Sequence, residues 1–197
     1  MTLFLRRRHL LLSAAATALS SVGVSALAGQ AKPPLAADRI VLPPVRRAIR
    51  SPSGGFELVI TSDDHWKTKL AIGELTDLSA PGRLRVWRMN LPQTQGPRRA
   101  LVTDQGSTVM FDSWLNVASP HAIVVVSAEG RQLAVHGFDA IVALLGVSRR
   151  TVAQHGRLGL WLSSEPVVSG DGLTVLLAAG DRHLRLWLAD GSLTLAD

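Results

Sequence analysis

Short turns rich in glycine and aspartate, each leading into an apolar run, recur along the chain and most constrain its fold. Glycine tolerates the positive φ of tight turns, and an aspartate side chain can hydrogen-bond its own backbone. The turns are Ser53-Gly54-Gly55, Asp104-Gln105-Gly106, Ala128-Glu129-Gly130 and Gly170-Asp171-Gly172. Four such turns predict a mainly β domain built from antiparallel hairpins.

A five-residue pattern that ends in tryptophan occurs three times, at 83–87 (RLRVW), 157–161 (RLGLW) and 183–187 (HLRLW). Alternate side chains of a strand point to opposite faces. The pattern therefore predicts amphipathic strands in which Leu84 and Val86 share one face while Trp87 covers the other. The third copy repeats this arrangement, with Trp187 opposite its two leucines.

These turns and tryptophan-ended runs resemble blades of WD-type β-propellers, in which an Asp-x-Gly or Asp-Gly turn precedes two apolar strands ending in an apolar-Trp pair. The resemblance covers 169–190 and, more loosely, 51–89. Blades of that family recur every ~40–45 residues, a spacing that the three tryptophans do not share. We therefore expect an antiparallel, propeller-like or sandwich-like hairpin sheet, with an ordinary twisted sheet as the alternative.

One segment departs from the β pattern and predicts a short helical insertion near 138–154. Its apolar residues follow helical spacing, with Gly137 before them and Gly146 after them. These residues are Phe138, Ile141, Val142 and Leu145.

The stretch 141–152 resembles a helix-turn-helix, which implies a turn at Gly146, a capping Ser148, and Arg149, Arg150 and Thr151 facing phosphates or base edges. Against this stand the export signal described below, the absence of a visible third helix, and Val142 where the motif favours alanine. We expect a helical corner packed on the sheet instead, and no nucleic-acid partner.

The first 28 residues have the parts of a cleavable signal peptide. Three arginines at 6–8 precede an apolar run, 10–27, which ends in Ala26-Leu27-Ala28. That small-x-small ending predicts cleavage before Gly29. A membrane span is the rival, but serines and Gly23 dilute the run.

Arg7-Arg8-His9-Leu10-Leu11 resembles the twin-arginine export signal, whose substrates cross the membrane already folded. An ordinary Sec peptide is the alternative. Gln30 stands where a lipoprotein would carry its lipidated cysteine, so no membrane anchor is expected after cleavage. The predicted location is periplasmic or secreted.

Residues 29–51, rich in proline and arginine, predict an extended lead-in to a single β-rich domain at 52–197. Removing the signal peptide lowers the net charge from +6 to +3, because three arginines leave with it. The remaining arginines are scattered, which argues against a polyanion-binding surface. The absence of cysteine excludes disulfides, thiolate metal sites and a cysteine nucleophile.

Asp63-Asp64-His65 is the single compact acidic and histidine cluster, and it suits either a divalent cation or, as we expect, a solvated turn. The remaining candidates are dispersed: His121, His136, His155 and His183; the turn aspartates Asp104, Asp171, Asp181 and Asp190; and Trp66, Trp87, Trp114, Trp161 and Trp187. The tryptophans suit the core or, as the alternative, a ligand-stacking cleft.

No motif assigns a catalytic residue, a cofactor site or a metal site. The sequence therefore predicts a non-catalytic interaction module that binds another envelope or secreted protein through a sheet surface or a hairpin edge. An exported hydrolase whose Ser, His and Asp meet only in space is the alternative. A helix-turn-helix function in DNA binding ranks third.

Overall fold

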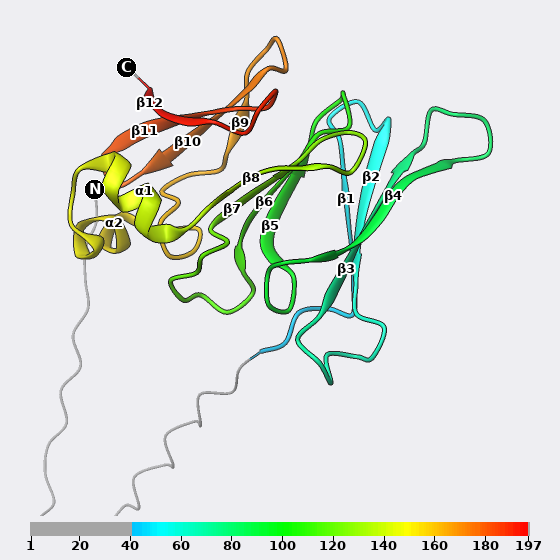
Figure 1. Ribbon diagram of the computed structural model, residues 1–197, viewed down its shortest axis with the longest axis horizontal. Coiled ribbons are helices and arrows are strands. Elements are labelled where there is room, and N and C mark those ends of the chain that lie inside the picture. Colours follow the sequence, from blue (N-terminus) through cyan, green and yellow to red (C-terminus); the bar gives the residue numbers. More distant parts are fainter. Residues whose placement is uncertain (1–40, 197) are drawn as a thin grey trace, which may run out of the picture. The chain divides into compact units, whose positions relative to one another are not determined.

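The computed structural model describes residues 41–196, which form three four-stranded antiparallel sheets and two short helices (Figure 1). The first sheet holds β1 (Arg46–Arg50), β2 (Phe56–Thr61), β3 (Ala71–Asp77) and β4 (Leu84–Leu91). The second holds β5 (Pro97–Val102), β6 (Thr108–Ser113), β7 (Ile123–Val126) and β8 (Gln132–His136). The third holds β9 (Val167–Val168), β10 (Thr174–Ala179), β11 (Arg182–Trp187) and β12 (Leu193–Ala196).

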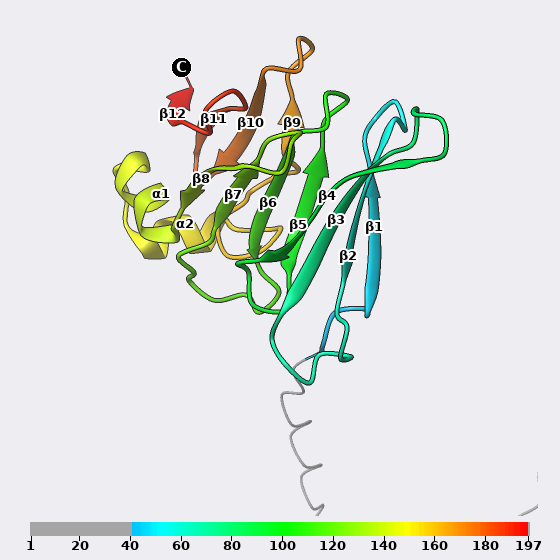
Figure 2. The same ribbon diagram turned by 45° about the vertical axis from the view of Figure 1, so that its right-hand side comes forward.

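Within each sheet the strands pair in chain order, as in the blades of a propeller. Figures 1 and 2 show the three sheets following one another across the molecule. The predicted mainly β, antiparallel, hairpin-built fold is confirmed. The predicted signal peptide, its cleavage site and most of the lead-in lie outside the described residues.

The first sheet begins earlier than the expected boundary at residue 52. Strand β1 lies within the lead-in and pairs with β2 from Arg46 opposite Thr61 to Arg50 opposite Glu57. The prolines around it, Pro44 and Pro52, flank the strand and remove no hydrogen bond from its ladder. An extended proline-rich stretch can therefore end in a strand.

Each of the four predicted turns joins two paired strands, namely β1 to β2, β5 to β6, β7 to β8 and β9 to β10. The third turn also contacts another sheet. Gly130 has a φ of 85°, and a Cβ there would lie 2.7 Å from the Cβ of Trp87. Only glycine permits both this backbone conformation and this close approach.

The second sheet is buried on both faces and holds the domain together. Met110 and Val124 pack with the first sheet, whereas Val109 and Phe111 pack with the third sheet and the helices. Strand β7 consequently consists of four buried β-branched residues with no polar alternation. The first and third sheets each bury only one face against it.

Helix α1 (Phe138–Leu145) matches the predicted helix, and α2 (Arg149–His155) follows it. Gly146 ends α1 in the left-handed region, and the hydroxyl of Ser148 accepts a hydrogen bond from the Thr151 amide at 3.0 Å. The guanidinium of Arg149 pairs with Asp139 at 2.5 Å. Phe138, Ile141, Leu145 and Val152 join the core beside the third sheet. No helix among residues 41–196 combines the length and apolarity needed to cross a bilayer.

The three tryptophan-ended copies adopt three different structures. In β11, Leu184 and Leu186 are buried and Trp187 faces outward, as predicted. In β4 the predicted division of faces is wrong: a bulge leaves Val86 without a partner opposite β3, and Val86 and Trp87 both pack against the core while Leu84 is exposed. The copy at 157–161 forms no strand.

The chain at 157–161 turns tightly because Gly156 lies against it. A Cβ on Gly156 would lie 2.7 Å from the carbonyl oxygen of Leu160. The amides of Arg157 and Leu158 both donate to the carbonyl of Leu162. This loop delivers Trp161, which is fully buried, into the core between the second and third sheets.

Candidate interaction surface

The outward side of the third sheet, which we call the third-sheet face, is largely apolar. Among its side chains Val167 is 58% exposed, and Leu176 and Trp187 are each 40% exposed. The alternation of the strands places opposite residues, such as Val175 and Leu186, in the core. The face comprises Val167, Thr174, Leu176, Ala178, His183, Arg185, Trp187, Thr194 and Ala196.

Arg185 is the central charge of the third-sheet face. Its neighbours across the strands are Leu176 and Thr194. Within residues 41–196 no carboxylate lies within 4.0 Å of its guanidinium. None of the nine side chains of the face is acidic. The face therefore offers an apolar surface with positive charge, which an acidic and apolar partner would complement.

The outward side of the first sheet, the first-sheet face, is polar. The Nε of Arg50 lies 2.8 Å from Glu57, and Arg46 lies 3.9 Å from the same carboxylate. Glu74 pairs with Arg85 at 3.8 Å. The face comprises Arg46, Ala48, Arg50, Glu57, Val59, Thr61, Ile72, Glu74, Thr76, Arg85, Arg88 and Asn90.

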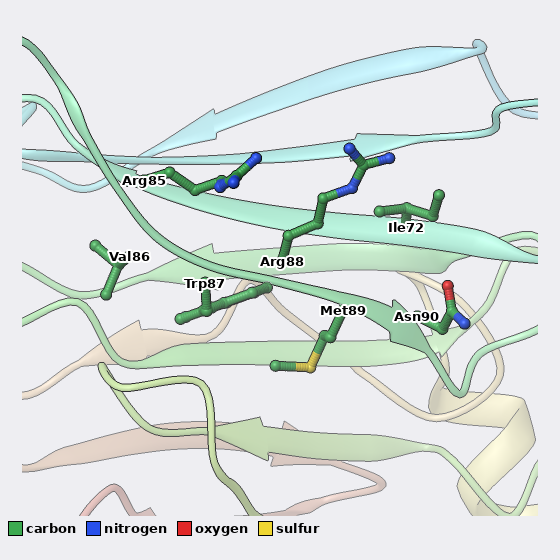
Figure 3. A pocket seen from close by; sticks show the side chains of 7 residues that line it. All are labelled: Ile72, Arg85, Val86, Trp87, Arg88, Met89 and Asn90. Atoms are coloured by element: carbon green, nitrogen blue, oxygen red, sulfur yellow. The ribbon is translucent and has the colours of Figure 1, made fainter.

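Figure 3 shows Arg85 and Arg88 reaching over the strands on the side of Ile72, while Trp87 and Met89 point the other way. A hollow of about 780 Å³ is lined by Ile72 and by every residue from 85 to 90. Consecutive residues of a strand line one hollow when it follows the unpaired edge of that strand. The arginines of β4 are the kind of charged edge residues that oppose pairing with another strand.

A cavity of about 280 Å³ lies where β1, β5 and the segment leading into β9 meet. It is lined by three arginines, one carboxylate and several apolar residues: Arg47, Arg98, Arg99, Glu165, Ile49, Ala100, Leu101, Phe111 and Pro166. No sequence motif predicted this cluster. The signal was present, because Arg-Arg-Ala followed by Ile or Leu occurs at both 46–49 and 98–101.

Arg47 fastens the first sheet to the second. Its terminal nitrogens donate to the carbonyls of Pro97 and Arg98, and its guanidinium lies 5.1 Å from the centre of the Trp114 ring. Burial lowers the pKa of Arg47. Its Nε is buried and finds no hydrogen-bond acceptor in the part of the chain that the structure describes.

Asp112, on β6, is a second buried polar residue that the sequence analysis missed. The indole of Trp161 donates to its carboxylate at 3.0 Å. Burial raises the pKa of Asp112 to about 6, although this hydrogen bond and the charge of Arg98 act in the opposite direction. Its φ of 51° is unusual for a residue other than glycine.

The predicted cluster Asp63-Asp64-His65 lies in an exposed loop after β2 and serves its local structure. Asp64 accepts hydrogen bonds from the Ser62 hydroxyl at 2.9 Å and the Thr68 amide at 2.7 Å. The hydrogen bonds from Thr68 are the main reason that the pKa of Asp64 falls to about 2. Asp63 pairs with Arg88 at 3.4 Å. Within residues 41–196 no three His, Asp or Glu side chains are grouped to hold a metal ion.

The remaining predicted candidates are not brought together. His136 and His155 each bond a backbone carbonyl, of Gly191 and Thr151. In the described part of the chain no hydrogen bond joins a histidine ring to a serine hydroxyl or a carboxylate, and the amide of His121 donates to the Ser119 hydroxyl only through the backbone. The exported-hydrolase alternative stays an untested prediction. Three of the turn aspartates, Asp104, Asp171 and Asp190, accept hydrogen bonds from backbone amides in or beside turns.

The tryptophans do not line one common cleft. Trp66 and Trp87 belong to the core between the first and second sheets, and Trp161 belongs to the other core. Trp114 packs under Arg47, and Trp187 alone lies on the third-sheet face. A ligand-stacking platform made of several tryptophans is therefore wrong for this chain.

Comparison with known proteins adds little. No protein-family model matches the chain, and no curated protein is recognisably similar to it in sequence. Among solved structures, one of a europium-containing methanol dehydrogenase matches with 14% identity and a TM-score of 0.36. The match covers 73% of this chain and 23% of that protein, so this chain spans about a quarter of its length. An identity this low transfers no function.

Proposed function

We propose that this chain is an exported interaction module that docks onto another envelope or secreted protein through the third-sheet face. The exposure of Val167, Leu176 and Trp187 around Arg185, which has no ion-pair partner among residues 41–196, is the observation that carries the proposal. Apolar patches of this kind cost solubility and mark interaction surfaces in folded proteins. The first-sheet face serves as the control surface within the same molecule, because its ion pairs make it polar and favour contact with water.

The partner surface that fits is apolar with at least one carboxylate opposite Arg185. A second copy of this chain fits less well. Two third-sheet faces would bring the uncompensated arginines together, and the first-sheet face also carries more arginines than carboxylates. The proposal therefore commits to a different, acidic protein.

Site-specific photocrosslinking in cells tests this surface directly. The crosslinking residue p-benzoylphenylalanine would replace Leu176 or Trp187, and Val59 on the first-sheet face would serve as the matched control. We expect a discrete adduct from positions 176 and 187 and none from position 59. Mass spectrometry of the adduct would then identify the partner.

Two outcomes contradict the proposal. An adduct with the mass of two copies of this chain would replace the foreign partner by self-association, and equal adducts from all three positions would show non-specific contact. A charge reversal, Arg185→Glu, is a further check, because it should abolish the adduct at position 176 without changing the thermal stability of the chain.

The export half of the proposal is tested by fractionating cells and sequencing the mature N-terminus. We expect periplasmic or secreted protein beginning near Gly29. Replacing Arg7 and Arg8 by lysine should block export if the twin-arginine route is used. An uncut cytoplasmic product would contradict export and revive the helix-turn-helix interpretation of 141–152.

A further inference from the structure

The cavity where β1, β5 and the segment leading into β9 meet carries more positive charge than the carboxylates among residues 41–196 neutralise. Three guanidinium groups line it, and Glu165 is the single lining carboxylate, 2.6 Å from Arg99. Within residues 41–196 no carboxylate lies within 4.0 Å of Arg47 or Arg98. Asp112, the nearest buried acid, hydrogen-bonds Trp161 and forms no ion pair with Arg98 at that distance.

The protein holds these guanidinium groups in place without using all their donors. Arg98 donates from Nη1 to the carbonyl of Trp114 at 3.2 Å. Arg99 donates from Nε to the carbonyl of Leu158 at 3.2 Å and from Nη1 to Glu165. An arginine has five N–H donors. Each side chain is thus oriented by the fold and keeps donors with no protein acceptor among the described residues.

The other walls of the cavity are apolar. Ile49 comes from β1, Leu101 from β5 and Phe111 from β6, and Phe111 packs against Trp161 with ring centres 6.3 Å apart. At roughly 30 Å³ for each water-sized group, 280 Å³ holds about nine such groups. The space therefore suits a small molecule with an anionic head and a short hydrocarbon or single-ring body.

We propose that this cavity binds a small amphipathic carboxylate, with its head on Arg98 and Arg99 and its apolar body against Leu101 and Phe111. Guanidinium groups match the geometry of carboxylates and form strong, charge-assisted hydrogen bonds with them. Glu165 competes with such a ligand for Arg99. The cavity shares no residue with the third-sheet face. A negative result for one proposal therefore does not contradict the other.

Calorimetric titration of the purified chain with benzoate, butyrate and inorganic phosphate tests this site. We expect saturable binding of benzoate that weakens as salt is added, and weaker binding of phosphate, which has no apolar body. Arg98→Met or Arg99→Met should each weaken benzoate binding about tenfold. Arg150→Met, on the exposed surface of α2, is the matched control and should leave binding unchanged.

Glu165→Gln separates a binding role from a structural one. Loss of the competing carboxylate frees Arg99, so benzoate should bind several-fold more tightly, whereas a damaged fold would bind less. Circular dichroism would confirm that each variant is folded. No saturable benzoate binding, equal affinity in Arg99→Met, or phosphate binding as tight as benzoate would overturn the proposal.

Discussion

Nearly the same sequence occurs as RLRVW at the start of strand β4 and as HLRLW at the end of strand β11, yet the two runs place their tryptophans on opposite sides. Trp87 is 7% exposed and belongs to the core, whereas Trp187 is 40% exposed on the third-sheet face. In β11 the alternation is unbroken. In β4 the bulge at Val86 shifts the pairing by one residue, so Trp87 lies opposite Leu75 on the inner side.

The first and third sheets also differ in the polarity of their outward faces. The outward residues of the first sheet form ion pairs within the sheet, as Glu57 does with Arg46 and Arg50. Within residues 41–196 the outward residues of the third sheet form no ion pairs, and their largest exposed members are apolar. The same architecture thus produces one side suited to solvent and one suited to a partner.

Replacing Trp87 or Trp187 singly by alanine should give the largest difference in stability between the two sheets. Trp87→Ala leaves a cavity beside Gly130 and should lower the free energy of unfolding by about 3–5 kcal/mol. Trp187→Ala should lower it by about 1 kcal/mol or less, because the ring is already partly in water. Urea unfolding followed by circular dichroism measures both.

Trp87→Phe is the control for volume. The indole nitrogen of Trp87 is buried without an acceptor, so phenylalanine removes an unpaired donor and should cost much less than alanine. If Trp187→Ala proves as costly as Trp87→Ala, the contrast between the two sheets is wrong.

The copy at 157–161 adds a pH-dependent difference through Asp112, which Trp161 binds. Since the pKa of Asp112 rises to about 6, the folded protein keeps a proton between about pH 4 and pH 6 that the unfolded chain releases. The contribution of this group to stability is therefore full at low pH and is lost as the pH rises through this window. Between pH 4 and pH 7 the free energy of unfolding of Asp112→Asn should therefore rise relative to that of the wild type by on the order of 2–3 kcal/mol.

Urea unfolding of wild type and Asp112→Asn at each pH measures this gain. Asp64→Asn is the control with the opposite sign, because hydrogen bonds from Thr68 lower the pKa of Asp64 to about 2. Stability from Asp64 is present above the unfolded pKa and is lost as the pH falls toward 2. A constant difference between Asp112→Asn and wild type would show that Asp112 titrates normally.

The smallest effect is expected at the ion pairs of the first-sheet face. Glu57→Gln removes the carboxylate shared by Arg46 and Arg50, and should lower stability by about 0.5–1 kcal/mol at low salt. The loss should shrink in 0.5 M NaCl, because exposed charges are screened. The opposite trend, a loss that grows with salt, would show that Glu57 stabilises the sheet by packing and not by charge.

The local elements of this fold were predictable because short-range chemistry determines them. The four hairpin turns depend on glycines next to apolar runs, and α1 depends on apolar spacing between Gly137 and Gly146. Strand β1 lies within the predicted extended lead-in, because Pro44 and Pro52 beside it favour extended backbone without specifying a partner strand. The copy at 157–161 has the alternation of a strand but forms none, because the chain folds back closely against Gly156. Alternation does not report such a contact.

The candidate sites were hidden for a different reason. The sequence offers one compact cluster of neighbouring residues, Asp63-Asp64-His65, and the expected turn is what Asp64 serves through its hydrogen bonds with Ser62 and Thr68. The cationic cavity joins Arg47 with Arg99 and Glu165, which are far apart in the chain. The two Arg-Arg-Ala segments at 46–48 and 98–100 are the one sequence signal that bears on it, and the sequence does not show that they meet.

The sequence by itself determined the hairpins, the helical insertion and the antiparallel class, since turn geometry and side-chain alternation act over a few residues. The packing of three sheets decided which faces are buried, which tryptophan is exposed and which arginines share a cavity. Those outcomes depend on strand register and on contacts between distant segments. A single bulge at Val86 interrupts in β4 the alternation that β11 keeps, and Trp87 lies in the core whereas Trp187 is exposed.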